Sequence, residues 1–165
     1  NSAFTQTEKN HLDMYRPMLA GDPLDGVEIY STSVILEDRT TIRHYLRMTE
    51  ETAAKIEATV EDQKLELQYY GPDKETDWNY YYVDVENIGA SNLDYTVAVS
   101  LTDGENTCEL RYSVLSYVYL VLQQGSNPGT ELETLAQALY LYNLSCEEDA
   151  VLPEAGENEF EILPF

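Results

Sequence analysis

Positive charge is scarce in this sequence. Lysine and arginine number 9 against 31 aspartates and glutamates, which gives a formal net charge of -22. Nucleic acid and anionic lipid are both bound through clustered lysine and arginine. The nearest approach to a cluster, Arg39, Arg43 and Arg47, is flanked by acidic residues. We therefore expect no nucleic acid partner and no attachment to a membrane surface, and we interpret the acidic surplus as a means of solubility.

Long apolar runs are also missing. No run reaches the roughly 18 residues of a membrane-spanning helix, so we expect no membrane insertion of this fragment. The first residues lack the basic and then apolar stretches of a signal peptide, but a leader can be removed, so this says nothing about export. At 165 residues, 43% of them hydrophobic, the sequence has the length and composition of one ordered domain.

Cysteine is rare as well. Cys108 and Cys146 are too few for a disulfide scaffold and have no metal-ligand spacing. Cys108 is expected on the inward face of a strand, and Cys146 continues the apolar stripe of a helix. A bridge between the two is favoured in an exported protein, and two inert buried thiols are the alternative.

Signatures of catalysis are absent. The sequence contains none of the hydrolase, zinc-protease or nucleotide-binding motifs in which spacing reveals chemistry. His44 falls on an apolar strand face, which indicates a hydrogen-bonded core residue, and His11 has no identifiable partner. Among 31 carboxylates some will be neighbours by chance. A glycoside-active enzyme, which needs such a pair, is therefore kept as the least favoured alternative.

What the sequence does contain is a series of alternating apolar and polar stretches. They predict strands over 27–37, 40–48, 64–70, 77–86, 95–101 and 107–112, and a short helix over 50–58 that Thr49 caps. Asp103-Gly104 is a strong hairpin signal between the last two strands. In the second strand, Arg43, Tyr45 and Arg47 fall on the face opposite the apolar residues.

After Tyr112 the apolar period changes from two to 3.6 residues. This predicts one helix from Ser113 to about Gln124 and a second that Thr130 caps. The two form a helical hairpin, in which we expect four side chains to be buried together against the sheet: Tyr117, Val121, Leu135 and Leu139.

Strands followed by helices predict one mainly β (α+β) domain over 1–165, an antiparallel β-sandwich-like sheet with a C-terminal helical hairpin. We divide it into an irregular N-terminal segment (1–26), a β-rich region (27–112), the helical hairpin (113–146) and an acidic tail or edge strand (147–165).

The stretch from Val85 to Asn143 resembles a domain of uncharacterised function that recurs in secreted and cell-surface modular proteins of gut Firmicutes. The residues that carry the resemblance are Ile88-Gly89-Ala90-Ser91-Asn92-Leu93-Asp94, Tyr95-Thr96-Val97-Ala98-Val99, Tyr112-Ser113-Val114-Leu115-Ser116-Tyr117 and Ala138-Leu139-Tyr140-Leu141-Tyr142-Asn143. The resemblance implies an extracellular or cell-surface location and an accessory or adhesive role beside neighbouring modules. It names no functional residues.

One pattern points to a ligand. Trp78, Tyr80 and Tyr82 lie at i, i+2 and i+4 of one predicted strand, so their rings project from the same face. Asp84 and Glu86 share that face and could accept hydrogen bonds from sugar hydroxyls. The hypothesis is a glycan-binding platform on the outer sheet, and the alternative is that these rings are ordinary core.

Calcium is the one cofactor that the sequence leaves open. Acidic turns offer hard oxygen ligands at two places: Asp22, Asp25 and Glu28 near the N-terminus, and Asp103 and Glu105 at the hairpin. The EF-hand pattern is absent, and short acidic turns are usually just solvated.

We therefore predict a non-catalytic binding or adhesion module whose partner is an extracellular glycan or a host or cell-surface protein. A structural spacer in a modular surface protein is the alternative, because fold class alone does not separate the two.

Overall fold

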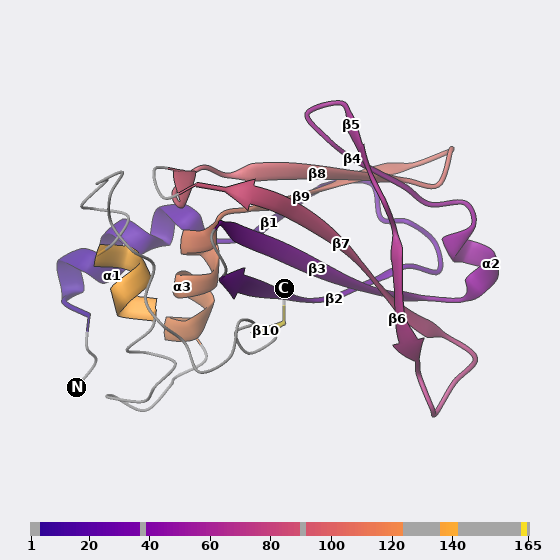
Figure 1. The fold of residues 1–165 in the computed structure, drawn as a ribbon, viewed down its shortest axis with the longest axis horizontal. Helices are drawn as coiled ribbons and strands as arrows, with labels where there is room; N and C mark the ends of the chain where they lie inside the picture. Colours follow the sequence, from indigo (N-terminus) through magenta and orange to yellow (C-terminus); the bar gives the residue numbers. More distant parts are fainter. Residues whose placement is uncertain (1–3, 37–38, 90–91, 124–135, 142–162, 165) are drawn as a thin grey trace.

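Two antiparallel sheets face each other in the computed structural model, which describes residues 4–36, 39–89, 92–123, 136–141 and 163–164 (Figure 1). Sheet A has the order β1 (Met18–Gly21), β9 (Thr107–Tyr112), β8 (Val97–Thr102), β4 (Glu57–Val60) and β5 (Gln63–Leu65). Sheet B has the order β10 (Leu163–Pro164), β2 (Glu28–Leu36), β3 (Thr40–Met48), β7 (Asn79–Ile88) and β6 (Gln68–Pro72). The predicted antiparallel β-sandwich-like fold is confirmed.

The core lies between the sheets because alternate residues of both point inward. Val97, Val99 and Leu101 of β8 are buried, and β9, which follows the Asp103-Gly104 turn, buries Leu110 and Tyr112 against them. In sheet B the inward residues of β3 and β7 join the same cluster: Ile42, Leu46, Met48, Tyr81, Val83 and Val85. The alternation of apolar and polar residues in the sequence therefore determines which side chains form this core.

The helices gather mainly at one end of the sandwich (Figure 1). There α1 (Gln6–Leu12) and the 3-10 turn η1 (Asp13–Tyr15) lie beside α3 (Val114–Gln123), while α2 (Glu50–Ala53) lies at the opposite end. Residues 136–141 are also helical. No helix in the described ranges is long and apolar enough to cross a membrane.

The predicted helical packing is confirmed where the structure describes it. Tyr117 and Val121 of α3 are fully buried, and so is Leu139 in the later helical stretch. All three belong to the core cluster that the sheets share. Leu135 and Cys146 lie outside the described residues.

The prediction of an irregular N-terminal segment was wrong. Residues 6–12 form α1, and β1 pairs with β9 in sheet A. The helix begins with a capping box, because the Thr5 hydroxyl accepts from the Glu8 amide while the Glu8 carboxylate accepts from the Thr5 amide. Only Leu12 of this helix is buried, so the apolar periodicity is too short to reveal it.

Three other expected boundaries also shift. The helix after Thr49 stops at Ala53, and β4 follows it as a strand of sheet A. The stretch 64–70, expected as one strand, is divided between β5 and β6, which belong to different sheets, and Tyr69 of β6 is exposed. Tyr95 precedes β8 and is likewise exposed.

Candidate functional site

The outer face of sheet B carries a band of aromatic side chains. Along β7, Tyr81, Val83 and Val85 are buried, whereas Tyr80 and Tyr82 project from the other face and are partly buried. Trp78 directly precedes the strand and is also partly buried. The three predicted rings are therefore neither core residues nor fully exposed.

Strand β3 supplies the neighbours of these rings. Its antiparallel register with β7 places Arg43 opposite Asp84, Tyr45 opposite Tyr82, and Arg47 opposite Tyr80. The outward-facing residues predicted in 40–48 therefore lie next to the outward-facing residues predicted in 77–86.

Two guanidinium groups cover two of the rings. The Arg43 Cζ atom lies 4.0 Å from the centroid of the Tyr82 ring, and the Arg47 Cζ atom lies 4.6 Å from the centroid of the Trp78 ring. These distances are typical of cation–π contacts, which hold a planar cation over the negative face of an aromatic ring. The rings are consequently fixed in place by arginines from the adjacent strand.

Carboxylates fix the same arginines from their edges. Arg43 donates from Nε and Nη2 to the two carboxylate oxygens of Asp84, at 2.8 and 3.0 Å. This hydrogen bonding raises the pKa of the Arg43 guanidinium further above its ordinary value. Arg47 donates from Nε to Glu28 at 2.7 Å and from Nη1 to Asp73 at 2.8 Å.

Asp73 connects Arg47 to the turn that precedes Trp78. Its carboxylate accepts from the Glu75 amide and the Thr76 hydroxyl, both at 3.1 Å. The bond from the Glu75 amide is the main reason that the pKa of Asp73 is lowered. The carboxylate therefore orders the turn and positions Arg47 at the same time.

More tyrosines flank the band on both sides. Tyr30 of β2 packs edge-on against Tyr80 with ring centroids 5.0 Å apart. Tyr70 of β6 contacts Tyr45 at 5.2 Å and Tyr82 at 6.2 Å. We call the whole set the aromatic face: Tyr30, Arg43, Tyr45, Arg47, Tyr70, Trp78, Tyr80 and Tyr82.

Exposure varies across the aromatic face. Tyr30 and Tyr70 at its flanks are 45% and 56% exposed, while Tyr45 in the middle is buried. Of the two predicted acidic residues, Glu86 is exposed, and Asp84 is partly buried with both oxygens bonded to Arg43. The surface thus presents ring edges and hydroxyls at its flanks and an ordered layer of rings and ion pairs between them.

The arginines and the flanking tyrosines were missed as site residues in the sequence. The alternation in residues 40–48 already places Arg43 and Arg47 on a polar face, so that signal was present. Their contact with Trp78 and Tyr82 follows only from the pairing of β3 with β7, two strands that α2, β4, β5 and β6 separate in the chain.

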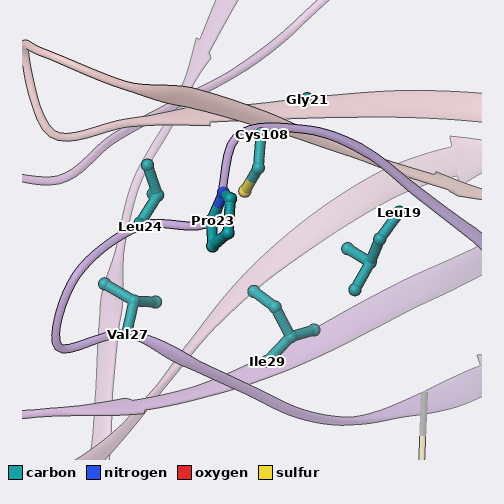
Figure 2. A pocket seen from close by; sticks show the side chains of 7 residues that line it. All are labelled: Leu19, Gly21, Pro23, Leu24, Val27, Ile29 and Cys108. Atoms are coloured by element: carbon teal, nitrogen blue, oxygen red, sulfur yellow. The ribbon is translucent and has the colours of Figure 1, made fainter.

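A second candidate is a cavity at the β1 edge of the sandwich (Figure 2). Its volume is about 330 Å³, and it is lined by Leu19, Gly21, Pro23, Leu24, Val27, Ile29 and Cys108. Burial raises the pKa of the Cys108 thiol, which disfavours the reactive thiolate form. Since no charged side chain lines this space, it offers room for an apolar group and no side-chain charge that would orient a substrate.

The predicted Cys108–Cys146 bridge stays a prediction. Cys108 is buried on the inward side of β9, as expected, and forms no disulfide within the described residues. Cys146 lies outside those residues.

Both histidines have partners. His44 is a core residue, as expected: Nδ1 is hydrogen-bonded to the Thr32 hydroxyl at 2.9 Å, and burial lowers the pKa of its imidazole to about 3. His11 Nδ1 is hydrogen-bonded to the Tyr140 hydroxyl at 2.8 Å, a contact between residues 129 positions apart that sequence spacing could not reveal.

Two of the acidic residues considered for calcium, Asp103 and Glu28, are bonded to groups of the protein itself. Asp103 accepts from the amides of Glu105 and Asn106, at 2.9 and 2.8 Å, and the bond from Asn106 is the main reason that the pKa of Asp103 is lowered. Glu28 is paired with Arg47, and Asp22 and Asp25 are exposed. Within the described ranges, no three histidine, cysteine or acidic side chains are grouped so that they could hold a metal ion.

Comparisons with models of protein families, with curated proteins and with solved structures gave no match for this chain.

Proposed function

We propose that the chain is a non-catalytic binding or adhesion module of a secreted or cell-surface bacterial protein, with the aromatic face as its binding surface and an extracellular glycan as the favoured ligand. The observation that carries the proposal is the ordered placement of Trp78, Tyr80 and Tyr82 on the outside of sheet B.

Order in the free protein favours binding because a surface that is already arranged loses less side-chain freedom when a ligand arrives. Arg43 and Arg47 hold two of the rings, and carboxylates from β7, β2 and the turn before Trp78 hold the arginines. Tyrosine, tryptophan and arginine are also the residues that contribute most at binding surfaces. Flat rings suit the apolar faces of sugars, and tyrosine hydroxyls can exchange hydrogen bonds with sugar hydroxyls.

The alternative is that the chain is a structural spacer, since a modular surface protein also needs domains whose only role is to separate other domains. Such a module does not need partly exposed rings arranged in one layer. A host or cell-surface protein is the alternative ligand, because aromatic and arginine side chains serve protein interfaces as well.

Glycoside hydrolysis is supported less. Its general acid is a carboxyl group with a raised pKa. Among the described residues, the carboxyl groups with a shifted pKa are Asp73 and Asp103, and both are shifted downward.

The proposal is tested by screening a broad glycan panel, including mucin glycans and plant polysaccharides, with the wild type and the Tyr80→Ala variant. We expect at least one ligand whose affinity falls about tenfold in Tyr80→Ala, which is the order of magnitude of one lost aromatic contact. Tyr95→Ala is the matched control, because Tyr95 is 56% exposed and lies next to β8 of sheet A.

Circular dichroism and thermal unfolding should show that both variants fold. Equal loss of affinity in the two variants would place the binding surface elsewhere. Failure of the wild type to bind any glycan of the panel would favour the spacer.

A further inference from the structure

We infer that the aromatic face selects uncharged saccharides and discriminates against acidic ones such as sialylated, sulfated or uronic acid glycans. This inference rests on the proposed function and specifies its ligand class. It runs against the first impression of the surface, because arginine beside aromatic rings is a common arrangement for recognising carboxylates.

N–H groups of Arg43 and Arg47 that could bind an acidic ligand already donate hydrogen bonds to carboxylates of the protein. Arg43 makes a two-pronged contact with both oxygens of Asp84, and the side chains of this pair are 19% and 20% exposed. Arg47 donates to Glu28 on one side and to Asp73 on the other. A carboxylate that approaches these same N–H groups would have to displace one of these residues.

The arginine faces are restricted too. Tyr82 lies against the Arg43 guanidinium and Trp78 against that of Arg47. A guanidinium held on one edge by carboxylates and on one face by a ring has fewer donors and less surface left for a further anionic partner.

The charge count of the cluster is negative. Arg43 and Arg47 supply two positive charges, and Asp84, Glu28 and Asp73 supply three negative ones, so the five side chains sum to one negative charge. Exposed Glu86 adds another on the same face, and the chain as a whole carries a formal charge of -22. Anionic ligands therefore meet repulsion both on approach and on contact.

An uncharged sugar meets none of these obstacles. Its apolar face can pack on the ring surface that the arginines leave uncovered, and its hydroxyls can donate to Glu86 or exchange hydrogen bonds with Tyr30 and Tyr70, which are exposed at the flanks. Neutral saccharides are thus the class that matches both the ring layer and the charge of the face.

The test compares ligands that differ mainly in charge. Suitable pairs are homogalacturonan with and without its methyl esters, and mucin glycans before and after removal of sialic acid and sulfate. For any pair that binds, we expect the neutral form to bind about fivefold or more tighter at low salt, the scale of about 1 kcal/mol for an exposed charge interaction. The difference should shrink as salt is added, because ions screen exposed charges.

Two variants release the arginines. Asp84→Asn frees part of the Arg43 edge and Glu28→Gln frees that of Arg47, with little change in side-chain shape. Each should improve binding of the acidic form by about twofold to fivefold relative to the neutral form. Asp62→Asn is the control: it removes one negative charge in the turn between β4 and β5 of sheet A, where asparagine tolerates the φ of 64°.

The outcomes separate the two proposals. Absence of binding to both forms of every pair and to every other glycan of the panel overturns the proposed glycan function, and the charge preference with it. Binding of the acidic form as tightly as the neutral form overturns the charge preference alone. A gain for the acidic form in Asp62→Asn as large as in Asp84→Asn would overturn the role of the occupied arginines, because net charge alone would then set the preference.

Discussion

Arg47 shows how single side chains organise the aromatic face. It extends from β3, packs over the Trp78 ring, and donates to Glu28 of β2 and to Asp73 in the turn before β7. These hydrogen bonds raise the pKa of Arg47 above its ordinary value, and the bond to Glu28 has the largest effect. One residue thereby connects three parts of sheet B, which lysine could not do because it lacks the planar fork of the guanidinium.

His44 has a different role at the same scale, because it serves the core. Burial lowers the pKa of its imidazole from 6.5 in the unfolded chain to about 3 in the folded protein. Between these values the unfolded state binds the extra proton, so acidification through this range favours unfolding.

We predict that this contribution can be isolated with His44→Gln, which cannot take up the proton. At pH 7 the wild type should be the more stable protein. As pH falls from 6.5 toward 4, its advantage in the free energy of unfolding should shrink by at most about 1.4 kcal/mol per pH unit. Urea unfolding of both proteins at several pH values measures the difference, and an advantage that stays constant with pH would show that His44 titrates normally.

At the scale of elements, β1 closes one edge of sheet A through a glycine. Gly21 pairs with Cys108 at a φ of +86°, and a Cβ atom built there would lie 2.5 Å from the Thr107 carbonyl oxygen. The backbone conformation and the close approach both require glycine at this position.

We predict that Gly21→Ala destabilises the protein by about 2–4 kcal/mol, because strain in the left-handed region adds to the clash. Two controls separate the causes. Gly104 has a φ of +96° but open space around it, so Gly104→Ala should show the backbone strain alone. Gly71 has neither a positive φ nor a close neighbour, so Gly71→Ala should change stability little. Chemical denaturation compares the three. A Gly21→Ala variant no less stable than Gly104→Ala would mean that β1 moves away from β9 without cost.

The elements differ in how far they could be predicted from sequence. The β8–β9 hairpin was predictable because Asp103-Gly104 sits between two clean alternations. In contrast, α1 was missed although Thr5 and Glu8 form a capping box, because so short a helix buries a single residue. The division of residues 64–70 between two sheets was not predictable, since either sheet accepts the same alternation.

The candidate site shows the same limit. The spacing of Trp78, Tyr80 and Tyr82 is enough to predict that the three rings share a face. The position of the arginines over two of these rings depends on the register between β3 and β7. No local pattern encodes the register between strands so far apart in the chain.

For the whole molecule, the two outer sheet faces differ in chemistry. In sheet A the ion pairs are Lys64–Glu57, with both side chains well exposed, and Arg111–Glu109, within a single strand. Pairs of this kind contribute at most about 1 kcal/mol each and order little of their surroundings. In sheet B the pairs Arg43–Asp84 and Arg47–Asp73 are partly buried, Arg47–Glu28 is more exposed, and both arginines lie over aromatic rings. This asymmetry, within a chain of strongly negative charge, is why we assign binding to one face of the sandwich.

The most direct test of this assignment is the fluorescence of Trp78, the only tryptophan in the chain. A neutral glycan identified by the panel is titrated into the wild type while emission is recorded, and its affinity is measured independently by calorimetry. We predict that the emission of Trp78 shifts with a dissociation constant equal to the calorimetric one. Saturable binding by calorimetry with unchanged Trp78 emission would contradict the assignment of the aromatic face as the binding surface.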